Sequence, residues 1–410
     1  TEEVILTLSM HSDMDTLCPL LGGCGPVNSS FSERGTPPPS APNRMKDHCS
    51  VIVKLVPEKN ELYTAHTTWT GYEDMTRVYK LYELPYSITR EKTVAGTNTV
   101  PGTSIAFSSY PGNVFSTDDW YTISSGLAVT ETTIDNHNTT LWQHVAPNTV
   151  LTWIRTMVAN RLAFDGPSWA NAFKEHNSGT YNNEFHVVDY NAFAKYKNGR
   201  GESALPRHLL TVVDQMPGHV EIADKTSVLK EKGYWASYNR PGLEATYKLA
   251  NYSATVNAYG PHYSHKLSSR AQLFDLLQDS IVDEANLKKV MRFNRFNDPA
   301  IPPSITHQMC RNGPSASNAI SERGDLTSVS SECGEDVAQQ NEGGIDLKYT
   351  TATMMEAANG LAAVAQSGPT YDNQPVFTWS TSPFAHVPHV GQPDRWEFPY
   401  VTIDWSEHAE

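Results

Sequence analysis

The sequence is poor in positive charge. Its 410 residues include 31 Lys and Arg against 45 Asp and Glu, which gives a formal net charge of −14 at pH 7. The few basic runs, at residues 230–232 and 288–289, are interrupted or flanked by acidic and apolar residues. Because a phosphate backbone is bound through concentrated positive charge, we expect no nucleic-acid partner.

Long apolar runs are missing as well. No stretch approaches the ~18 consecutive apolar residues that a membrane-spanning helix needs, so we expect no transmembrane segment. Residues 1–8 have neither the basic start nor the small-residue cleavage site of a signal peptide. The chain does not begin with Met, and we expect its natural N-terminus to lie upstream of Thr1.

Signatures of cofactor and metal binding are absent too. The sequence has no Gly-rich phosphate loop, no H-E-x-x-H and no C-x-x-C. His262 and His265 are three residues apart and could be metal ligands on a helix, but the neighbouring Gly and Pro favour a loop. We therefore expect no cofactor and no metal ion.

Cysteine is scarce and odd in number, with five residues in the chain. Cys18 and Cys24 flank a short segment containing Pro and Gly, and Cys310 and Cys333 bracket a polar stretch. Each pair is a candidate disulfide, although spacing alone does not fix the connectivity. Cys49 is then left over as a candidate reactive thiol. The alternative is that Cys49 only packs at the start of an apolar strand, or is itself half of a disulfide.

Three N-x-Ser/Thr sequons begin at Asn28, Asn138 and Asn251. Each tripeptide is common by chance, but the three together with the acidic composition and the pairable cysteines favour passage through the secretory pathway. The 15 His residues would suit an acidic compartment, because their charge changes near pH 6.

Cys49 lies where a linker ends and an apolar strand begins. Residues 25–47 are rich in Pro and Ser and have little to bury, whereas residues 49–56 read as a dense β-strand. If the His48–Cys49 bond is cut, Cys49 gains a free α-amine beside its own sulfur. A nucleophile with a built-in base of this kind is the mechanism of an N-terminal-nucleophile hydrolase.

The strand that follows can bring a histidine to the same thiol. Residues 57–60 are typical of a turn and residues 61–69 of a returning strand. In this register Cys49 lies opposite Thr68, and His66 lies opposite Val51 on the face of Cys49, at a diagonal distance of roughly 7–8 Å. The alternative is a His that only caps the sheet face, and a slip of one residue would turn it away.

Strands with helices between and outside them favour an α+β fold in layers. We expect residues 49–410 to form one hydrolase domain, preceded in 1–48 by the remnant of an upstream chain and the linker. Expected core positions of the helical stretch 149–175 are Leu151, Ile154, Val158, Leu162 and Phe173. The expected elements are strands at 1–9, 104–112, 118–134 (two), 184–190 and 209–213, helices around 14–21, 70–84, 149–175 and 271–294, and a tail at 376–405 that wraps the surface.

Many short stretches resemble the phospholipase B-like family, a group of lysosomal and secreted proteins. Together they extend over nearly all of residues 49–405. The clearest are Cys49-Ser-Val-Ile-Val-Lys-Leu, Ala65-His-Thr-Thr-Trp69, Phe107-Ser-Ser-Tyr-Pro-Gly112, Glu131-Thr-Thr133, Asn177-Ser-Gly-Thr-Tyr-Asn-Asn183, Tyr234-Trp-Ala-Ser-Tyr-Asn239, Ser269-Arg-Ala-Gln272 and Trp379-Ser-Thr-Ser-Pro-Phe384.

The resemblance implies an N-terminal-nucleophile fold, a four-layer αββα sandwich, and self-cleavage before Cys49 into two chains that stay associated. It makes Cys49 the nucleophile, and it places five other residues in the pocket: His66, Trp69, Thr133, Asn239 and Arg270.

Physical roles follow from the side-chain chemistry. We expect the side-chain amide of Asn239 to donate to the oxyanion, and Thr133 to orient the amine. Arg270 would hold the backbone of Cys49 or lower the pKa of its thiol. His66 would carry a proton or contact substrate. Asn239 and Trp69 could instead be purely structural.

The implied substrate is an acyl ester of a phospholipid. An N-acyl or peptide-like amide is the alternative substrate, and a glycoprotein without catalytic activity is the alternative function. The resemblance also implies the lysosome or the outside of the cell as location and the cleaved N-terminal fragment as partner, and a homodimer is compatible with it.

Overall fold

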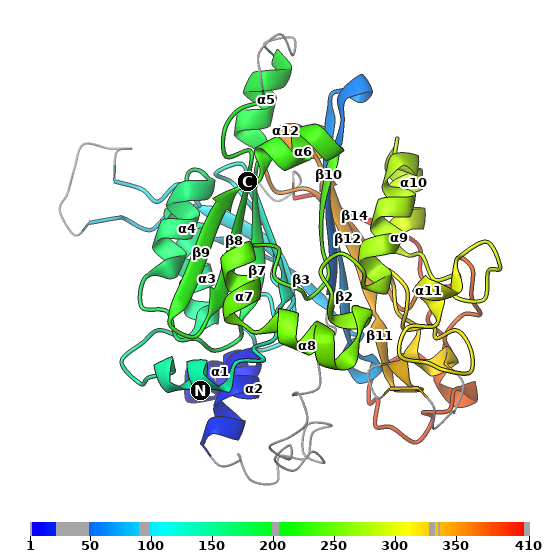
Figure 1. Cartoon of the computed structure of the whole chain (residues 1–410). Helices are drawn as coiled ribbons and strands as arrows, with labels where there is room; N and C mark the ends of the chain where they lie inside the picture. Colours follow the sequence, from blue (N-terminus) through cyan, green and yellow to red (C-terminus); the bar gives the residue numbers. More distant parts are fainter. Residues whose placement is uncertain are drawn as a thin grey trace.

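Two antiparallel sheets face each other in the computed structural model, which describes residues 2–21, 49–89, 98–198, 205–327, 333–334 and 337–405 (Figure 1). The first sheet has the order β10 (Tyr234–Ser237), β1 (Cys49–Val56), β2 (Glu61–Gly71), β12 (Asp346–Thr351), β13 (Ala363–Ser367) and β14 (Val401–Ile403), and β11 (Glu342–Gly344) also pairs with β2. The second sheet has the order β3 (Val78–Glu83), β4 (Ser104–Ser109), β5 (Trp120–Ile123), β6 (Leu127–Thr133), β7 (Asn183–Asp189), β8 (Leu210–Met216) and β9 (His219–Asp224).

Helices cover the outer face of each sheet. On the first sheet, α9 (Ser269–Leu277) and α10 (Glu284–Met291) pack against apolar side chains of β1, β2, β10 and β12. On the second sheet, α3 (Thr152–Leu162) and α4 (Gly166–Lys174) pack against β4 to β8. The expected four-layer αββα sandwich is therefore confirmed, with helices on the far left and far right of Figure 1 and the sheets between them.

The remaining helices lie at the ends of the sandwich. Apolar residues of α5 (Tyr190–Asn198), α6 (Thr226–Lys232) and α12 (Ala352–Ala357) join strands of both sheets in one cluster. The helices α7 (Glu244–Leu249), α8 (Tyr252–Tyr259) and α11 (Pro303–Thr306) follow β10 along the chain. No helix in the described part of the chain has the length and apolar character needed to cross a bilayer.

The β1–β2 hairpin has the predicted register. Cys49 pairs with Thr68, Val51 with His66 and Val56 with Glu61. The connection is a single turn at Pro57–Lys59, and Asn60 closes it in the left-handed conformation that Asn tolerates well. The turn chemistry of residues 57–60 thus fixes the register of the strand that carries His66.

Residues 1–9 were predicted to be a strand, and this is wrong. Glu2–Ser9 form the helix α1, with Glu2 and Glu3 in its first turn, where the helix dipole favours negative charge. The next helix, α2 (His11–Leu20), was predicted from the sequence. Together α1 and α2 pack against the second sheet and the segments around it. Asp13 accepts hydrogen bonds there from the backbone of Thr152 and the hydroxyl of Thr180.

Residues 70–84 do not form the predicted helix. A short turn at Tyr72–Asp74 is followed by β3, which pairs along its whole length with β4. The residues of β3, Val78-Tyr-Lys-Leu-Tyr-Glu83, include one β-branched and two aromatic side chains, a strand preference that the helical interpretation overlooked.

The predicted core face of α3 is also wrong. Val158 and Leu162 are 45% and 40% exposed, whereas Trp153, Arg155 and Asn160 face the sheet. Arg155 lies over the ring of Phe173 at 4.4 Å and donates to buried oxygens around it. These buried hydrogen bonds let a polar face of the helix pack against the sheet, which reverses the expected orientation.

Phe173 on α4 is buried and Val158 on α3 is exposed, so we expect different losses of stability when each side chain is truncated to Ala. Phe173→Ala should lower the free energy of unfolding by about 3–5 kcal/mol, because a fully buried ring leaves a cavity. Val158→Ala should change it by less than about 0.5 kcal/mol, because the side chain is exposed. Urea denaturation of both variants would check this, and a loss in Val158→Ala as large as that in Phe173→Ala would contradict the exposed position of Val158 on α3.

The C-terminal tail does more than wrap the surface. Phe377, Trp379 and Trp396 are buried together against Tyr72 and Ile345, and β14 extends the edge of the first sheet beside β13. The tail therefore contributes a small core of its own to the sandwich.

Candidate active site

Cys49 begins β1, which lies between β10 and β2 in the first sheet. It is the free thiol among the described cysteines, and it is buried. Its backbone N donates to Oδ1 of Asn239 at 3.4 Å, and its carbonyl oxygen accepts from Nη1 of Arg270 at 2.5 Å. Both backbone polar groups of Cys49 are therefore held in place.

Asn239 holds three parts of the site together. Its Oδ1 accepts from Cys49 N and, at 2.7 Å, from Nη2 of Arg270, while its Nδ2 donates to the carbonyl oxygen of Thr133 at 2.7 Å. These contacts fix the orientation of the amide, because a flip would place its donors against donors. Nδ2 is thus already bonded to Thr133, which contacts Asn239 through its backbone carbonyl oxygen.

Arg270 lies in the first turn of α9 and stacks on Trp69. Its guanidinium carbon is 4.2 Å from the centre of the Trp69 ring, and the indole N–H donates to the carbonyl of Ile320 at 3.2 Å. Trp69 therefore supports Arg270 from one face, while Asn239 and Cys49 take its hydrogen bonds. The structure thus brings together the six residues that the sequence and the resemblance predicted for the pocket.

His66 approaches the sulfur from β2, as the hairpin register required. Its side chain is fully buried, and Nε2 has no hydrogen-bond partner in the described ranges. Burial lowers the pKa of His66 well below its ordinary value, and the positive charge of Lys348 lowers it further. The imidazole is therefore held in its neutral form.

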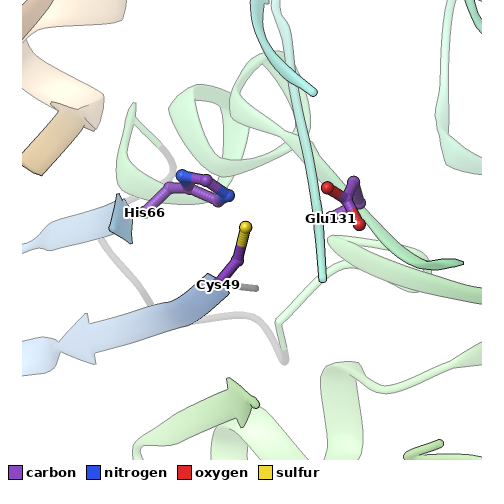
Figure 2. A group of neighbouring side chains, drawn as sticks. All are labelled: Cys49, His66 and Glu131. Atoms are coloured by element: carbon purple, nitrogen blue, oxygen red, sulfur yellow. The ribbon is translucent and has the colours of Figure 1, made fainter. Parts of the chain in front are cut away.

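Glu131 is the residue that sequence reasoning missed. It comes from β6 in the opposite sheet, and its carboxylate, a nitrogen of His66 and Sγ of Cys49 all lie within 4.8 Å of one another (Figure 2). Tyr181 donates to Oε1 at 3.2 Å, while Oε2 has no partner among the described residues. The available signal was an acidic residue in the β-branched run 129–133, since a buried Glu normally needs a partner.

The thiol itself is held in its protonated form. Burial raises the pKa of Cys49 well above its ordinary value, and the negative charge of Glu131 adds to the effect. The backbone N–H of Trp69 and the charge of Lys348 oppose this rise but do not cancel it. A proton acceptor beside the sulfur is therefore essential for any nucleophilic chemistry.

A buried network of two cations and two carboxylates lies behind His66. Lys348 donates to Asp118 and Asp346 at 2.6 Å each and to the hydroxyl of Thr68 at 2.7 Å. Arg77 also contacts both carboxylates. Because Thr68 pairs with Cys49 across the hairpin, this network supports the strand opposite Cys49. The four charged residues come from three segments that are far apart in the sequence, so the sequence gave no sign of the network.

Asp118 and Asp119 lie in contrasting environments although they are adjacent. Burial alone would raise the pKa of Asp118, but Arg77 and Lys348 hold it well below its usual range. Burial raises the pKa of Asp119 well above its usual range, and Asp118 raises it further. Burial also raises the pKa of Glu131, as does the nearby Asp119.

The raised pKa of Asp119 predicts a pH-dependent stability. Between the pKa values of the unfolded and folded states, the folded chain binds one proton more, so stability falls as pH rises. Compared with Asp119→Asn, the wild type should lose about 1.4 kcal/mol for each pH unit crossed in that window. Urea midpoints of both proteins from pH 4 to pH 7 would check this, and a constant difference would contradict it.

The other predicted sites fall in different places. Cys310 and Cys333 form the predicted disulfide, and Cys18 is disulfide-bonded, while Cys24 lies outside the described residues. His48 and Asn28 lie outside them too. Of the other sequon residues, Asn251 is exposed, whereas Nδ2 of Asn138 donates to the carbonyl of Leu249 at 2.9 Å.

Some solved structures resemble this chain in part. The conjugated bile acid hydrolase of Clostridium perfringens, in a mutant form, matches with a TM-score of 0.41 and 9% identity, over 86% of this chain and 97% of that one.

Proteins related by sequence share a much higher identity with this chain than that solved structure does. The human protein named "Putative phospholipase B-like 2" is 44% identical over 361 residues, which cover 87% of this chain and 59% of the human protein. The bovine protein of the same name is 43% identical over 360 residues, again 87% of this chain and 59% of the relative. A Caenorhabditis elegans protein named "Putative phospholipase B-like 1" is 37% identical over 88% of this chain and 60% of its own length. The chain thus spans about three fifths of the length of these relatives. The Phospholipase B family model matches residues 1–403, and the chain, with Cys49 at the start of β1, belongs to the phospholipase B family.

Proposed function

We propose that this chain is a cysteine-dependent acyl hydrolase that frees the amine of Cys49 by cleaving its own backbone. The observation that carries the proposal is the setting of Cys49, whose backbone N is bonded to Asn239, whose carbonyl is bonded to Arg270, and whose sulfur lies beside a neutral His66. The partners of both backbone groups are polar side chains, and Asn239 thereby lies beside the nitrogen that cleavage would free. Membership of a hydrolase family supports the same conclusion.

Self-cleavage has to occur before the α-amine exists, so it needs another base. In the proposed step Sγ of Cys49 attacks the carbonyl carbon of residue 48 while His66 takes the thiol proton. The C–N bond breaks, the nitrogen of Cys49 takes a proton, and a thioester joins the two parts. Water then hydrolyses the thioester, which gives a carboxylate at residue 48 and a free α-amine at Cys49.

In later turnover the α-amine is the proton carrier. It takes the thiol proton, the thiolate attacks the acyl carbon of the substrate, and the amine gives the proton to the leaving group. Water then hydrolyses the acyl thioester, which releases the acid and restores the thiol. Oδ1 of Asn239 already accepts from this nitrogen, so it would orient the amine. This assigns Asn239 a positioning role in place of the oxyanion-donor role expected from the sequence.

The substrate class proposed first is an acyl ester of a phospholipid, in line with the family name. An amide of a fatty acid or peptide is the alternative, because one thioester mechanism serves both. The lysosome or the extracellular space is the proposed location. The contacts of Asp13 with Thr152 and Thr180 would keep the N-terminal fragment bound after cleavage.

Two measurements on the purified chain test the proposal. N-terminal sequencing and intact mass should show a second chain that begins at Cys49. Hydrolysis should then be compared for an ester and an amide of the same acyl chain, and faster release from the ester supports the lipid substrate. An uncut backbone at residue 48 together with no release from either compound would overturn the proposal.

A further inference from the structure

The candidate active site brings together three side chains that bind soft divalent cations. Sγ of Cys49, a ring nitrogen of His66 and a carboxylate oxygen of Glu131 lie within 4.8 Å of one another. The three point toward a common centre from both sheets of the sandwich (Figure 2). Neither the sequence motifs nor the proposed hydrolysis explains why a carboxylate should face the thiol.

The hydrogen bonding shows that this group is incomplete. Nε2 of His66 and Oε2 of Glu131 are buried without a partner in the described ranges. Buried polar atoms are normally bonded, so each unpartnered atom needs an explanation, such as a missing ion. Two such atoms, on two residues whose side chains lie beside one thiol, are an independent sign of a ligand.

The local charges also favour a dication. Lys348 and Arg77 are bound to Asp118 and Asp346, so two positive charges already balance two negative ones. Nothing in the described network forms an ion pair with Glu131. A thiolate, a carboxylate and a neutral imidazole would leave two negative charges, which one divalent cation neutralises.

The geometry points to a Zn²⁺ site formed by Cys49, His66 and Glu131, in which the metal reversibly blocks the nucleophile. Zn²⁺ accepts sulfur, imidazole nitrogen and carboxylate oxygen, with bonds of ~2.0–2.3 Å. Atoms already within 4.8 Å need only small side-chain rotations to share one ion. Three protein ligands leave the fourth tetrahedral position open.

Binding removes the thiol proton and any proton on Glu131 to solvent, so no other reactant is needed. The bound ion occupies the sulfur lone pair that would attack an acyl carbon. The inhibitory role therefore rests on the proposed hydrolysis, whereas the metal site itself does not.

Co²⁺ is a suitable probe because it takes the same ligands and shows thiolate-to-metal charge transfer. Titration of the full chain should give one bound Co²⁺ with this absorption band, and Zn²⁺ should displace it. His66→Gln and Glu131→Gln should each weaken binding at least ~10-fold, as expected when part of a metal site is lost. The exposed controls His144→Gln and Glu175→Gln should leave binding unchanged.

The outcomes separate this inference from the hydrolase proposal. Absence of the charge-transfer band, or a band that is unchanged in both Glu131→Gln and His66→Gln, would overturn the metal site even if the chain hydrolyses esters. A band with the expected dependence in a chain without hydrolytic activity would support the site and remove only its inhibitory role. Near-ultraviolet circular dichroism would identify a misfolded variant. If His66→Gln or Glu131→Gln is misfolded, the Co²⁺ titration of the other one tests the metal site.

Discussion

Cys49→Ala should abolish both cleavage of the 48–49 bond and turnover of every acyl substrate. In the proposed mechanism the same sulfur forms both thioesters, so no second nucleophile can replace it. The loss in turnover should be about 10⁴-fold or more, because removal of the nucleophile of a coupled catalytic group eliminates most of its rate enhancement. Intact mass and an acyl-release assay on the same preparation would measure both effects.

Cys49→Ser provides the graded comparison. A hydroxyl retains an attacking atom but is harder to deprotonate than a thiol, so cleavage should be slow but detectable over long incubation. Both variants should keep the thermal midpoint of the uncut wild type within a few degrees, since sulfur is replaced by a smaller group at one end of a strand. Full turnover by folded Cys49→Ala would contradict every step assigned to this residue.

The β1–β2 hairpin shows what local sequence can determine. Its turn residues and alternating side chains are contiguous, so the pairing of Val51 with His66 followed from counting. The position of Cys49 at the strand start was visible for the same reason. Predictions that depended on neighbouring residues of one hairpin were therefore confirmed in detail.

Contacts between the two sheets could not be derived in this way. Glu131 reaches Cys49 only because β6 of one sheet faces β1 of the other, and no spacing in the chain encodes that distance. Asn239 and Arg270 were found only through the resemblance, and the positioning role that we propose for Asn239 rests on its hydrogen bonds. The buried polar face of α3 was missed for a related reason, because the partners of Arg155 come from other segments.

The buried network behind the active site is expected to be essential for stability as well as for the nucleophile. Lys348 has 2% of its side chain exposed, and it bonds two carboxylates that are also buried. Its removal would leave Asp118 and Asp346 to share Arg77, with one negative charge uncompensated in the interior. Leaving a buried charge without its partner costs about 3–5 kcal/mol.

Lys348→Met should therefore lower the free energy of unfolding by about 3–5 kcal/mol and also slow self-cleavage, because Thr68 loses its bond to Nζ opposite Cys49. The matched control is Lys248→Met, which breaks an exposed ion pair with Glu244 and should leave the urea midpoint unchanged. The loss in Lys348→Met should shrink as the pH falls, because Asp118 takes up a proton more readily once a cation that lowers its pKa is gone. If the two Met variants unfold at the same urea concentration at pH 7, the network is not the support for β2 that its geometry indicates.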